Sequence, residues 1–266
     1  MERIEALQKL IVHILDRHDI PSSKYLFKKH VGVGVSNARF HFYCASCMNL
    51  VAETSGDLME RNRVKATCSV CTKSLTGRQM IADGNFFITL PVQQQLSALL
   101  ADESVANALH DGLNSIAGRV SAAAEHVSDI TDGALYKEFR SKLNSRDAIT
   151  LTLSSDGSPT FKSSKYSIWP VQLSLNELPV HMRHKNILIS ALWYGQDHPN
   201  MTLLLSPVVR EMEKLADNSV EWMSRGKTLH SKVNIPHFIL THMVSCAWKL
   251  PTPCFFVHCS VLCASA

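Results

Sequence analysis

The sequence predicts an α+β protein in which an N-terminal helix and a cysteine-rich module precede a sheet with helices. Three observations support this fold class: apolar residues recur at helical spacing near the N-terminus, two Cys-x-x-Cys pairs punctuate an aperiodic stretch, and apolar and polar residues alternate strictly from Ile149 onward. The chain has 266 residues and is 45% hydrophobic, so it can bury the core of one large or two modest domains.

The first helix is expected within residues 2–18, and Pro21 follows closely enough to end it. Its apolar positions are Ile4, Leu7, Ile11, Ile14 and Leu15. The opening residues lack the basic and apolar regions of a secretory signal, and no apolar run reaches the length of a membrane span. We therefore expect an intracellular protein without a membrane partner, in which the eight cysteines stay reduced.

Two cysteine pairs carry the most specific signal in the chain. Each pair encloses two residues, and 20 residues separate the pairs. Two such knuckles can supply four thiolates to one tetrahedral ion and leave no position open for water. The sequence therefore predicts a structural Zn²⁺ site, and buried or redox-active cysteines without metal are the alternative. The predicted ligands are Cys44, Cys47, Cys68 and Cys71.

The module around these cysteines is locally basic, although the net charge of the whole chain is only +4. Between Ser22 and Met80 there are nine Lys or Arg residues and three acids. A four-thiolate zinc site carries a formal charge of −2, which leaves a modest positive excess. This excess suits phosphate contacts or an ordinary solvated face. The candidate nucleic-acid-binding residues are Arg61, Arg63, Lys65, Lys73 and Arg78.

A second set of elements follows this module. Residues 86–90 form a predicted strand that Pro91 ends, and leucines at helical spacing follow between Leu96 and Leu113. Residues 115–132 are rich in alanine and serine, which is typical of a loosely packed helix or a linker.

From Ile149 the pattern predicts three strands and then a helix. Apolar residues alternate over 149–153 and again over 169–175, and the turn residues of Asp156–Pro159 lie between them, so the two strands form a predicted hairpin. A third apolar run covers 187–193, and 203–216 has helical spacing. Trp169 and Trp193 alternate with aliphatic residues and are expected in the core rather than stacked on bases.

The string LTLSSDGSPTFKSSKYSIWPVQLSLNELP, with the following WYG, PNM and LLSPVVREMEKL, resembles the core of CACTA-type (En/Spm-like) transposases and of animal transposase-domain proteins. The resemblance covers residues 148–222. HFYCASC, CSVC and FFITLP also resemble the zinc-bearing front of such animal proteins.

The resemblance implies an RNase H-like core that cuts and joins DNA with three acids and two Mg²⁺ or Mn²⁺ ions. It assigns the first acid to Asp156. It also implies DNA as partner, nuclear localisation and no small-molecule substrate, and it is compatible with a protein partner or a homo-oligomer.

The sequence departs from the family where the second acid is expected, on a strand after the helix. The Asp-x-Pro-Ala element is absent, and the 45 residues after Glu221 contain no Asp or Glu. We therefore expect a truncated RNase H-like mixed sheet in a transposase-derived, catalytically inactive protein that binds DNA or protein. One alternative is an active transposase whose missing acids come from a longer product or a partner chain. Another is a fragment that folds poorly.

The expected division is an N-terminal helical segment, a zinc ribbon, a helical connector, a partial RNase H-like transposase domain and a divergent tail, over residues 1–40, 41–80, 81–147, 148–245 and 246–266. The tail contains three further cysteines and Cys246, whose irregular spacing favours apolar packing or disorder over a second metal site.

Overall fold

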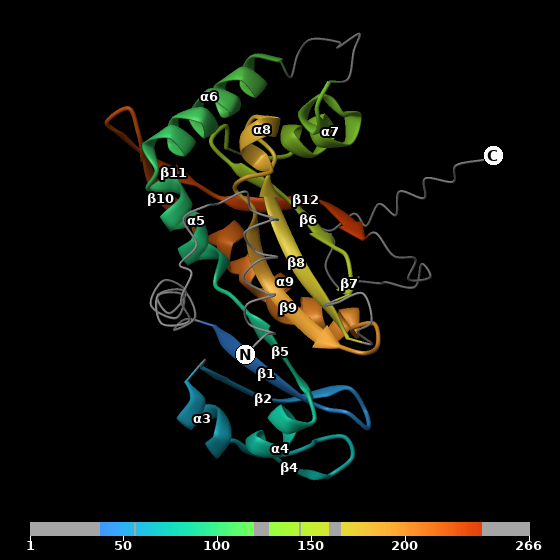
Figure 1. Ribbon diagram of the computed structural model, residues 1–266. Helices are drawn as coiled ribbons and strands as arrows, with labels where there is room; N and C mark the ends of the chain where they lie inside the picture. The colour runs from blue at the N-terminus through green and yellow to red at the C-terminus, as the bar shows by residue number, and fades with distance from the viewer. Residues whose placement is uncertain (1–37, 56, 120–127, 144, 160–165, 241–266) are drawn as a thin grey trace, which may run out of the picture. The chain divides into compact units, whose positions relative to one another are not determined.

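The computed structural model describes residues 38–55, 57–119, 128–143, 145–159 and 166–240 (Figure 1). The predicted helix at 2–18 and the tail at 246–266 lie outside these residues. The chain divides into two compact units, residues 1–85 and 86–266. The second unit contains the predicted transposase domain and all but the first five residues of the predicted connector. Among the helices of the described residues, none is long and apolar enough to cross a membrane.

The first unit is built from two antiparallel strand pairs and two short helices. Asp57 caps the first helix by accepting hydrogen bonds from the backbone N–H groups of Met59 and Glu60 at 2.8 and 3.0 Å. Gly77 opens the second helix at a point where a Cβ atom would lie 2.0 Å from the carbonyl oxygen of Arg61, so only glycine allows this close approach. The elements are β1 (Arg39–Cys44), β2 (Asn49–Ser55), α3 (Leu58–Arg63), β3 (Lys65–Thr67), β4 (Ser74–Thr76) and α4 (Gly77–Ala82).

The second unit contains a mixed sheet, as expected. Its strands lie in the order β12-β6-β8-β9-β5, and the short β7 pairs with β8. All of these neighbours are antiparallel except β12, which runs parallel to β6. The strands are β5 (Phe86–Thr89), β6 (Ile149–Ser155), β7 (Ser158–Pro159), β8 (Ser167–Leu175), β9 (Leu188–Gly195) and β12 (Val233–Leu240).

The strands predicted from alternation form, but the segment between them is not a simple turn. Ser158 and Pro159 were expected as turn residues, and instead they pair with Ile168 and Ser167 of β8. The prediction of a turn was therefore wrong for residues 158–159. The reason is that β8 is longer than β6, so its first residues have backbone groups that β6 does not pair and β7 can.

The helix α9 packs on the sheet and also contacts the start of α5. The helix α9 contacts β5, β9 and β12, and the Oε1 atom of its Glu211 accepts a hydrogen bond from the backbone N–H of Val92 at 2.6 Å. This carboxylate satisfies the free amides at the start of α5. The helices are α5 (Val92–Leu100), α6 (Glu103–Arg119), η1 (Ile130–Asp132), α7 (Ala134–Ser141), α8 (Val180–Arg183) and α9 (Met201–Asp217).

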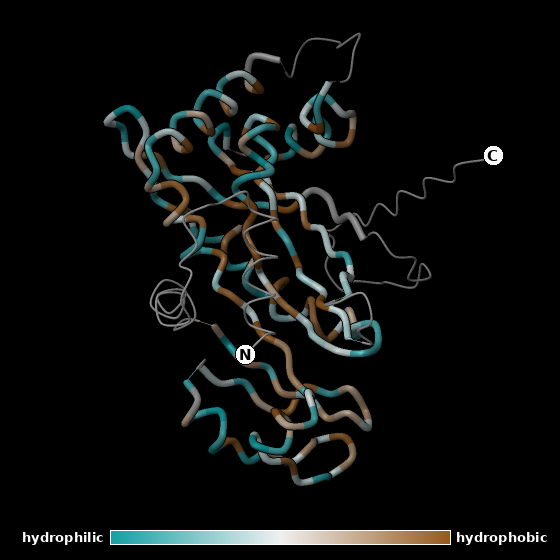
Figure 2. Tube along the Cα trace, in the orientation of Figure 1, coloured by the Kyte–Doolittle hydropathy of each residue, from teal (hydrophilic) through white to brown (hydrophobic). Residues whose placement is uncertain are grey.

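The apolar side chains of β8 lie on one face of the sheet and are buried there. Trp169 and Trp193 are 7% and 4% exposed, as expected for core residues, and they pair directly across β8 and β9. Figure 2 shows hydrophobic residues running along the strands of this sheet and hydrophilic residues at the tip of the β10–β11 hairpin. Burial of these apolar side chains is the main source of the unit's stability.

A second hairpin, which the sequence analysis did not predict, consists of β10 (Val220–Ser224) and β11 (Lys227–Ser231). Arg225 and Gly226 form its turn with φ of 50° and 74°, as two-residue hairpin turns require. The hairpin packs on α6, where the Ser224 hydroxyl donates to Asn107 at 2.8 Å and lies 3.0 Å from Nδ1 of His110.

Candidate metal centre and the sheet end at Asp156

The four predicted zinc ligands meet in the first unit. The sulfur atoms of Cys44, Cys47, Cys68 and Cys71 all lie within 4.8 Å of one another, and all four cysteines are free of disulfides. Three of the distances are 3.5 Å (Cys44 to Cys71), 3.4 Å (Cys47 to Cys68) and 4.0 Å (Cys47 to Cys71). Four cysteines in this arrangement could hold a metal ion such as zinc.

The spacing of the sulfur atoms matches the geometry of a zinc site. A Zn–S bond is about 2.3 Å long, so two sulfurs at the corners of a regular ZnS₄ tetrahedron are about 3.8 Å apart. The three distances bracket this value. Two of the cysteines, Cys44 and Cys68, are buried, which excludes water from that side of the cluster.

The two cysteine pairs have the same local backbone structure. Each lies at the tip of a hairpin, between β1 and β2 or between β3 and β4. The N–H groups of Met48 and Thr72 donate to the carbonyl oxygens of Cys44 and Cys68, at 2.8 and 2.9 Å. Met48 and Thr72 also have positive φ, 53° and 58°. Because the spacing and the turn are repeated, the two knuckles present their sulfurs in equivalent ways.

Backbone amides turned towards the sulfurs favour thiolates at the first cysteine of each pair. The amide of Ser46 is the main cause that lowers the pKa of Cys44. The amides of Cys71 and Val70 lower the pKa of Cys68 to about 6. Amide donors of this kind stabilise the charged sulfur that a metal requires.

In the absence of a cation, the pKa of the second cysteine of each pair is raised rather than lowered. The hydrogen bond with Cys68 raises the pKa of Cys47 to about 12. The amide of Lys73 acts to lower the pKa of Cys71, but contact with Cys44 and burial raise it overall. Four thiolates this close repel one another, so a divalent cation is needed to hold all four ionised.

The predicted nucleic-acid-binding residues all lie in the first unit, but they differ in their side-chain contacts. Arg61 packs its guanidinium 4.2 Å above the ring of Phe40, and Lys73 donates to the Ser46 hydroxyl at 2.7 Å. The others are exposed: Arg63 at the end of α3, Lys65 in β3 and Arg78 in α4.

Two contacts bring the segments that carry these three residues together. Lys65 pairs with Thr76, and Gly77 donates its N–H to Val64 at 2.7 Å. Within the described residues, Arg63, Lys65 and Arg78 form no ion pair with an acid. They are therefore available for an anionic partner.

Asp156 lies at the carboxyl end of β6, exposed to solvent. The next residue, Gly157, faces Trp169: a Cβ atom at Gly157 would lie 2.4 Å from the indole ring. Glycine is therefore required directly after Asp156. In the part of the chain that the structure describes, Asp156 does not belong to any group of three or more residues able to share a metal ion.

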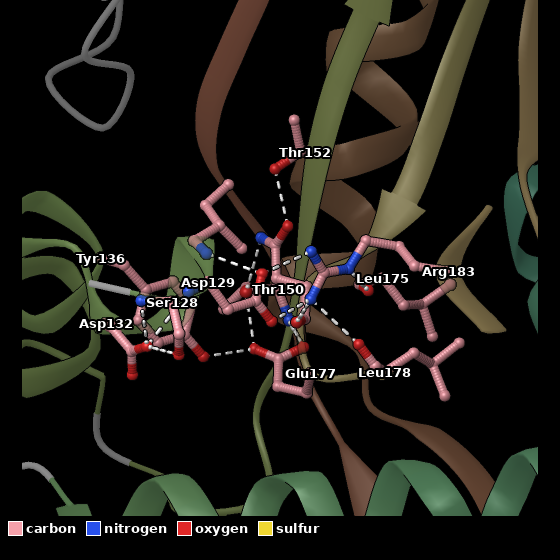
Figure 3. Close-up of polar contacts among 12 residues, drawn as sticks. Ser128, Asp129, Asp132, Tyr136, Thr150, Thr152, Leu175, Glu177, Leu178 and Arg183 are labelled. Atoms are coloured by element: carbon pink, nitrogen blue, oxygen red, sulfur yellow. Dashed lines mark hydrogen bonds and ion pairs between the residues drawn. The ribbon is translucent and has the colours of Figure 1, made fainter. Parts of the chain in front are cut away.

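A buried carboxylate at the other end of β6 was not predicted from the sequence. Glu177, the acid of the NELP string, has a fully buried side chain. It accepts hydrogen bonds from the Tyr136 hydroxyl (2.7 Å), the Thr150 hydroxyl (2.6 Å) and the Thr150 N–H (3.0 Å) (Figure 3). Its Oε1 also lies 3.7 Å from Nη1 of Arg140. An acid directly after a buried apolar strand was the available signal for this site.

Burial is the main cause that raises the pKa of Glu177, whereas its hydrogen bonds and Arg140 act in the opposite direction. Burial also raises the pKa of Tyr136, so the phenol stays protonated and donates. Arg140 itself donates to the carbonyl oxygens of Ala148 and Arg146. The cluster joins α7, β6 and the end of β8, and its buried polar groups satisfy one another, so its role is structural.

Asn176 extends this network along β6. Its side chain accepts from the Thr152 hydroxyl at 2.6 Å and donates to the Thr150 hydroxyl at 2.9 Å. The threonines of the alternating pattern are thus buried and satisfied, rather than exposed to water.

Arg183 lies at the same end of the sheet, where β8 ends. Its guanidinium donates to both carboxylate oxygens of Asp129 at 2.8 and 2.7 Å, and also to the carbonyl oxygens of Asn176 and Leu178 (Figure 3). The hydrogen bond with Arg183 is the main cause that lowers the pKa of Asp129 below its ordinary value near 3.8. This ion pair joins η1 to the turn after β8.

We expect Asp129→Asn to lower the free energy of unfolding by about 1–2 kcal/mol at pH 7, because a hydrogen-bonded charge pair is lost while asparagine still caps η1. The folded pKa is depressed, so the stabilisation is present above about pH 4 and disappears as the pH falls through the folded pKa. Urea denaturation of both proteins between pH 7 and pH 3 measures this. A difference that stays constant over this range would contradict the ion-pair assignment.

One family model matches part of the second unit. Residues 125–243 match the model of the transposase family tnp2. The match includes Asp156, Glu177 and the whole of β12, and it supports a transposase family, as the sequence resemblance indicated. No curated protein matches the chain.

Proposed function

We propose that this chain is a transposase-derived, zinc-binding protein that binds DNA in the nucleus and does not cleave it by itself. The observation that carries the proposal is the tnp2 match over a sheet in which β6 ends directly before Asp156. The CACTA type and the animal origin suggested by the resemblance are part of the same proposal.

The strand order supports an RNase H-like core. Three antiparallel strands, β6, β8 and β9, are followed by α9 and then by β12, which returns parallel to β6. In the register of this pair, Leu240 lies opposite Ser155, so β12 ends directly beside Asp156. This is where an RNase H-like transposase would carry its second acid.

The residues of β12 support the absence of cleavage. The strand reads VNIPHFIL and contains no carboxylate, and no Asp or Glu follows it in the sequence. Two-metal phosphoryl transfer needs several carboxylates to hold both ions, and Asp156 alone cannot do this.

The charge distribution of the first unit supports DNA contact. Three acids of the described part of the unit are engaged within it: Glu53 pairs with Arg39 at 2.7 Å, Glu60 accepts from the Ser55 hydroxyl and Asp57 caps α3. A fourth acid, Asp83, is exposed at the end of α4. Arg63, Lys65 and Arg78 are exposed and, within the described residues, form no ion pair with an acid, so they can contact phosphates. Zn²⁺ would be structural and would hold the two knuckles in place.

We expect the purified, zinc-loaded chain to bind duplex DNA without cutting it in Mn²⁺. Substituting alanine for Arg63, Lys65 and Arg78 together should lower the affinity at least tenfold and reduce the salt slope of log K by about 3, since three phosphate contacts are lost. Fluorescence anisotropy at several salt concentrations measures binding, and gel electrophoresis measures cleavage.

The matched control removes Lys137, Arg146 and Lys185, three cations near the end of the sheet opposite to Asp156. It should leave DNA affinity unchanged. Equal losses in both triple variants, or no DNA binding at all, would contradict the proposal. Cleavage that Asp156→Ala abolishes would instead favour the alternative, an active transposase whose further acids come from a partner chain or a longer product.

A further inference from the structure

Two exposed tyrosines stack on each other at the end of the sheet where Asp156 lies. Tyr166 directly precedes β8, and Tyr194 lies near the end of β9. Their ring centroids are 5.1 Å apart and the rings are inclined by only 11°. The two residues are 39% and 48% exposed, so part of each side chain faces solvent.

The strand register places this tyrosine pair on the same face of the sheet as Asp156. Tyr194 pairs with Ile168, and Ile168 pairs with Ser158, so these three residues share one face. Gly157 faces Trp169 on the opposite, buried face. Because successive residues of an extended chain alternate between faces, Asp156 belongs to the face of the tyrosines. Two strand spacings, about 10 Å, separate Tyr194 from Ser158.

The chemistry of this surface suits a flat ligand. A nucleobase stacks on a tyrosine ring through its π face, and this contact needs no cation nearby. Bases within a duplex are already stacked on their neighbours, so only an unpaired base can use such a surface.

We propose that Tyr166 and Tyr194 form a stacking platform for an unpaired base of a DNA end, about 10 Å from the start of β7. The proposal rests on the DNA-binding function proposed above. It assigns to this platform the recognition of single-stranded DNA ends, whereas the cations of the first unit bind duplex phosphates.

The test compares a blunt duplex with the same duplex carrying a five-nucleotide 3′ overhang that contains 2-aminopurine. Tyr194→Ala and the double variant with Tyr166→Ala should bind the overhang DNA about tenfold more weakly and lose the 2-aminopurine quenching. The blunt duplex should be unaffected. The loss should not depend on salt concentration, because stacking releases no counterions.

Two controls separate stacking from general damage. Tyr194→Phe keeps the ring and should behave as the wild-type chain, and Met223→Ala removes another exposed apolar side chain, 60% exposed, from the unrelated β10. Unchanged overhang binding in the double variant, or equal losses for blunt and overhang DNA, would overturn the platform.

The result for the wild-type chain tests the underlying function separately. If it binds neither probe, the proposed DNA-binding function fails and the platform fails with it. If it binds both probes equally and the tyrosine variants do the same, only the platform fails. A proline-rich peptide that binds the wild-type chain and not Tyr194→Ala, without any preference for overhang DNA, would assign the surface to a protein ligand and overturn the proposal.

Discussion

Removal of the metal with a chelator is expected to unfold the first unit and leave the second unit folded. The first unit has strands of three to seven residues and helices of six, which are too short to be stable by themselves. Its buried apolar side chains are few, and Cys44 and Cys68 lie among them. In modules of this size, metal binding supplies the free energy of folding.

The two units can be observed independently. The chain has four tryptophans, Trp169, Trp193, Trp222 and Trp248, and all of them follow residue 86. Tryptophan fluorescence therefore reports on the second unit, and amide hydrogen exchange over 38–85 reports on the first. Chelation should remove protection from exchange in the first unit, shift its thermal transition below room temperature and leave the fluorescence melt unchanged.

Cys68→Ser should reproduce the effect of the chelator, because three thiolates no longer close the tetrahedron. The matched control is Cys246→Ser, which changes a cysteine outside the predicted set. Metal analysis should give one zinc per chain in the control and much less in Cys68→Ser. A metal-free chain that keeps full exchange protection in residues 38–85 would disprove the structural role of zinc.

Substitution of Glu177 is expected to have the next largest effect. Glu177→Ala leaves the Tyr136 and Thr150 donors without their acceptor and leaves the buried guanidinium of Arg140 without a carboxylate nearby. Removing one partner of a buried ion pair typically costs about 3–5 kcal/mol in the free energy of unfolding. Urea denaturation followed by tryptophan fluorescence measures the loss.

Glu138 provides the matched control. It pairs with Lys142 at 2.7 Å on the surface of α7, close in the sequence to Tyr136 and Arg140. Glu138→Ala should leave the urea midpoint essentially unchanged, because exposed ion pairs contribute little. Similar midpoints for Glu177→Ala and Glu138→Ala would show that the buried network does not stabilise the fold.

Local patterns accounted for much of the fold. The strict alternation after Ile149 predicted β6, and the apolar runs predicted β8 and β9, since a strand places successive side chains on opposite faces of its sheet. The helical spacing over 203–216 predicted α9 within two residues at its start. The cysteine spacing predicted which sulfurs meet, and the geometry of a two-residue knuckle is itself local.

The strands after α9 escaped prediction for a different reason. β10 alternates from Val220 to Ser224, but it is short, and β12 contains Pro236 and is interrupted by a register shift in its pairing with β6. Their place is set by partners far away in the sequence, α6 for the hairpin and β6 for β12. Such long-range pairing leaves little periodicity in a segment of five to eight residues.

The sequence by itself determined the four clustered sulfurs, the alternating strands and the single acid at the end of β6, because each depends on spacing within a few residues. Only the tertiary structure decided that the polar face of β6 is buried over Glu177 and Asn176, that β12 returns beside Asp156, and that Tyr166 and Tyr194 stack. In each of these features the residues that meet are separated by between 24 and 85 positions in the sequence. The pattern of a short segment does not indicate which distant residues will lie on the same face of a sheet.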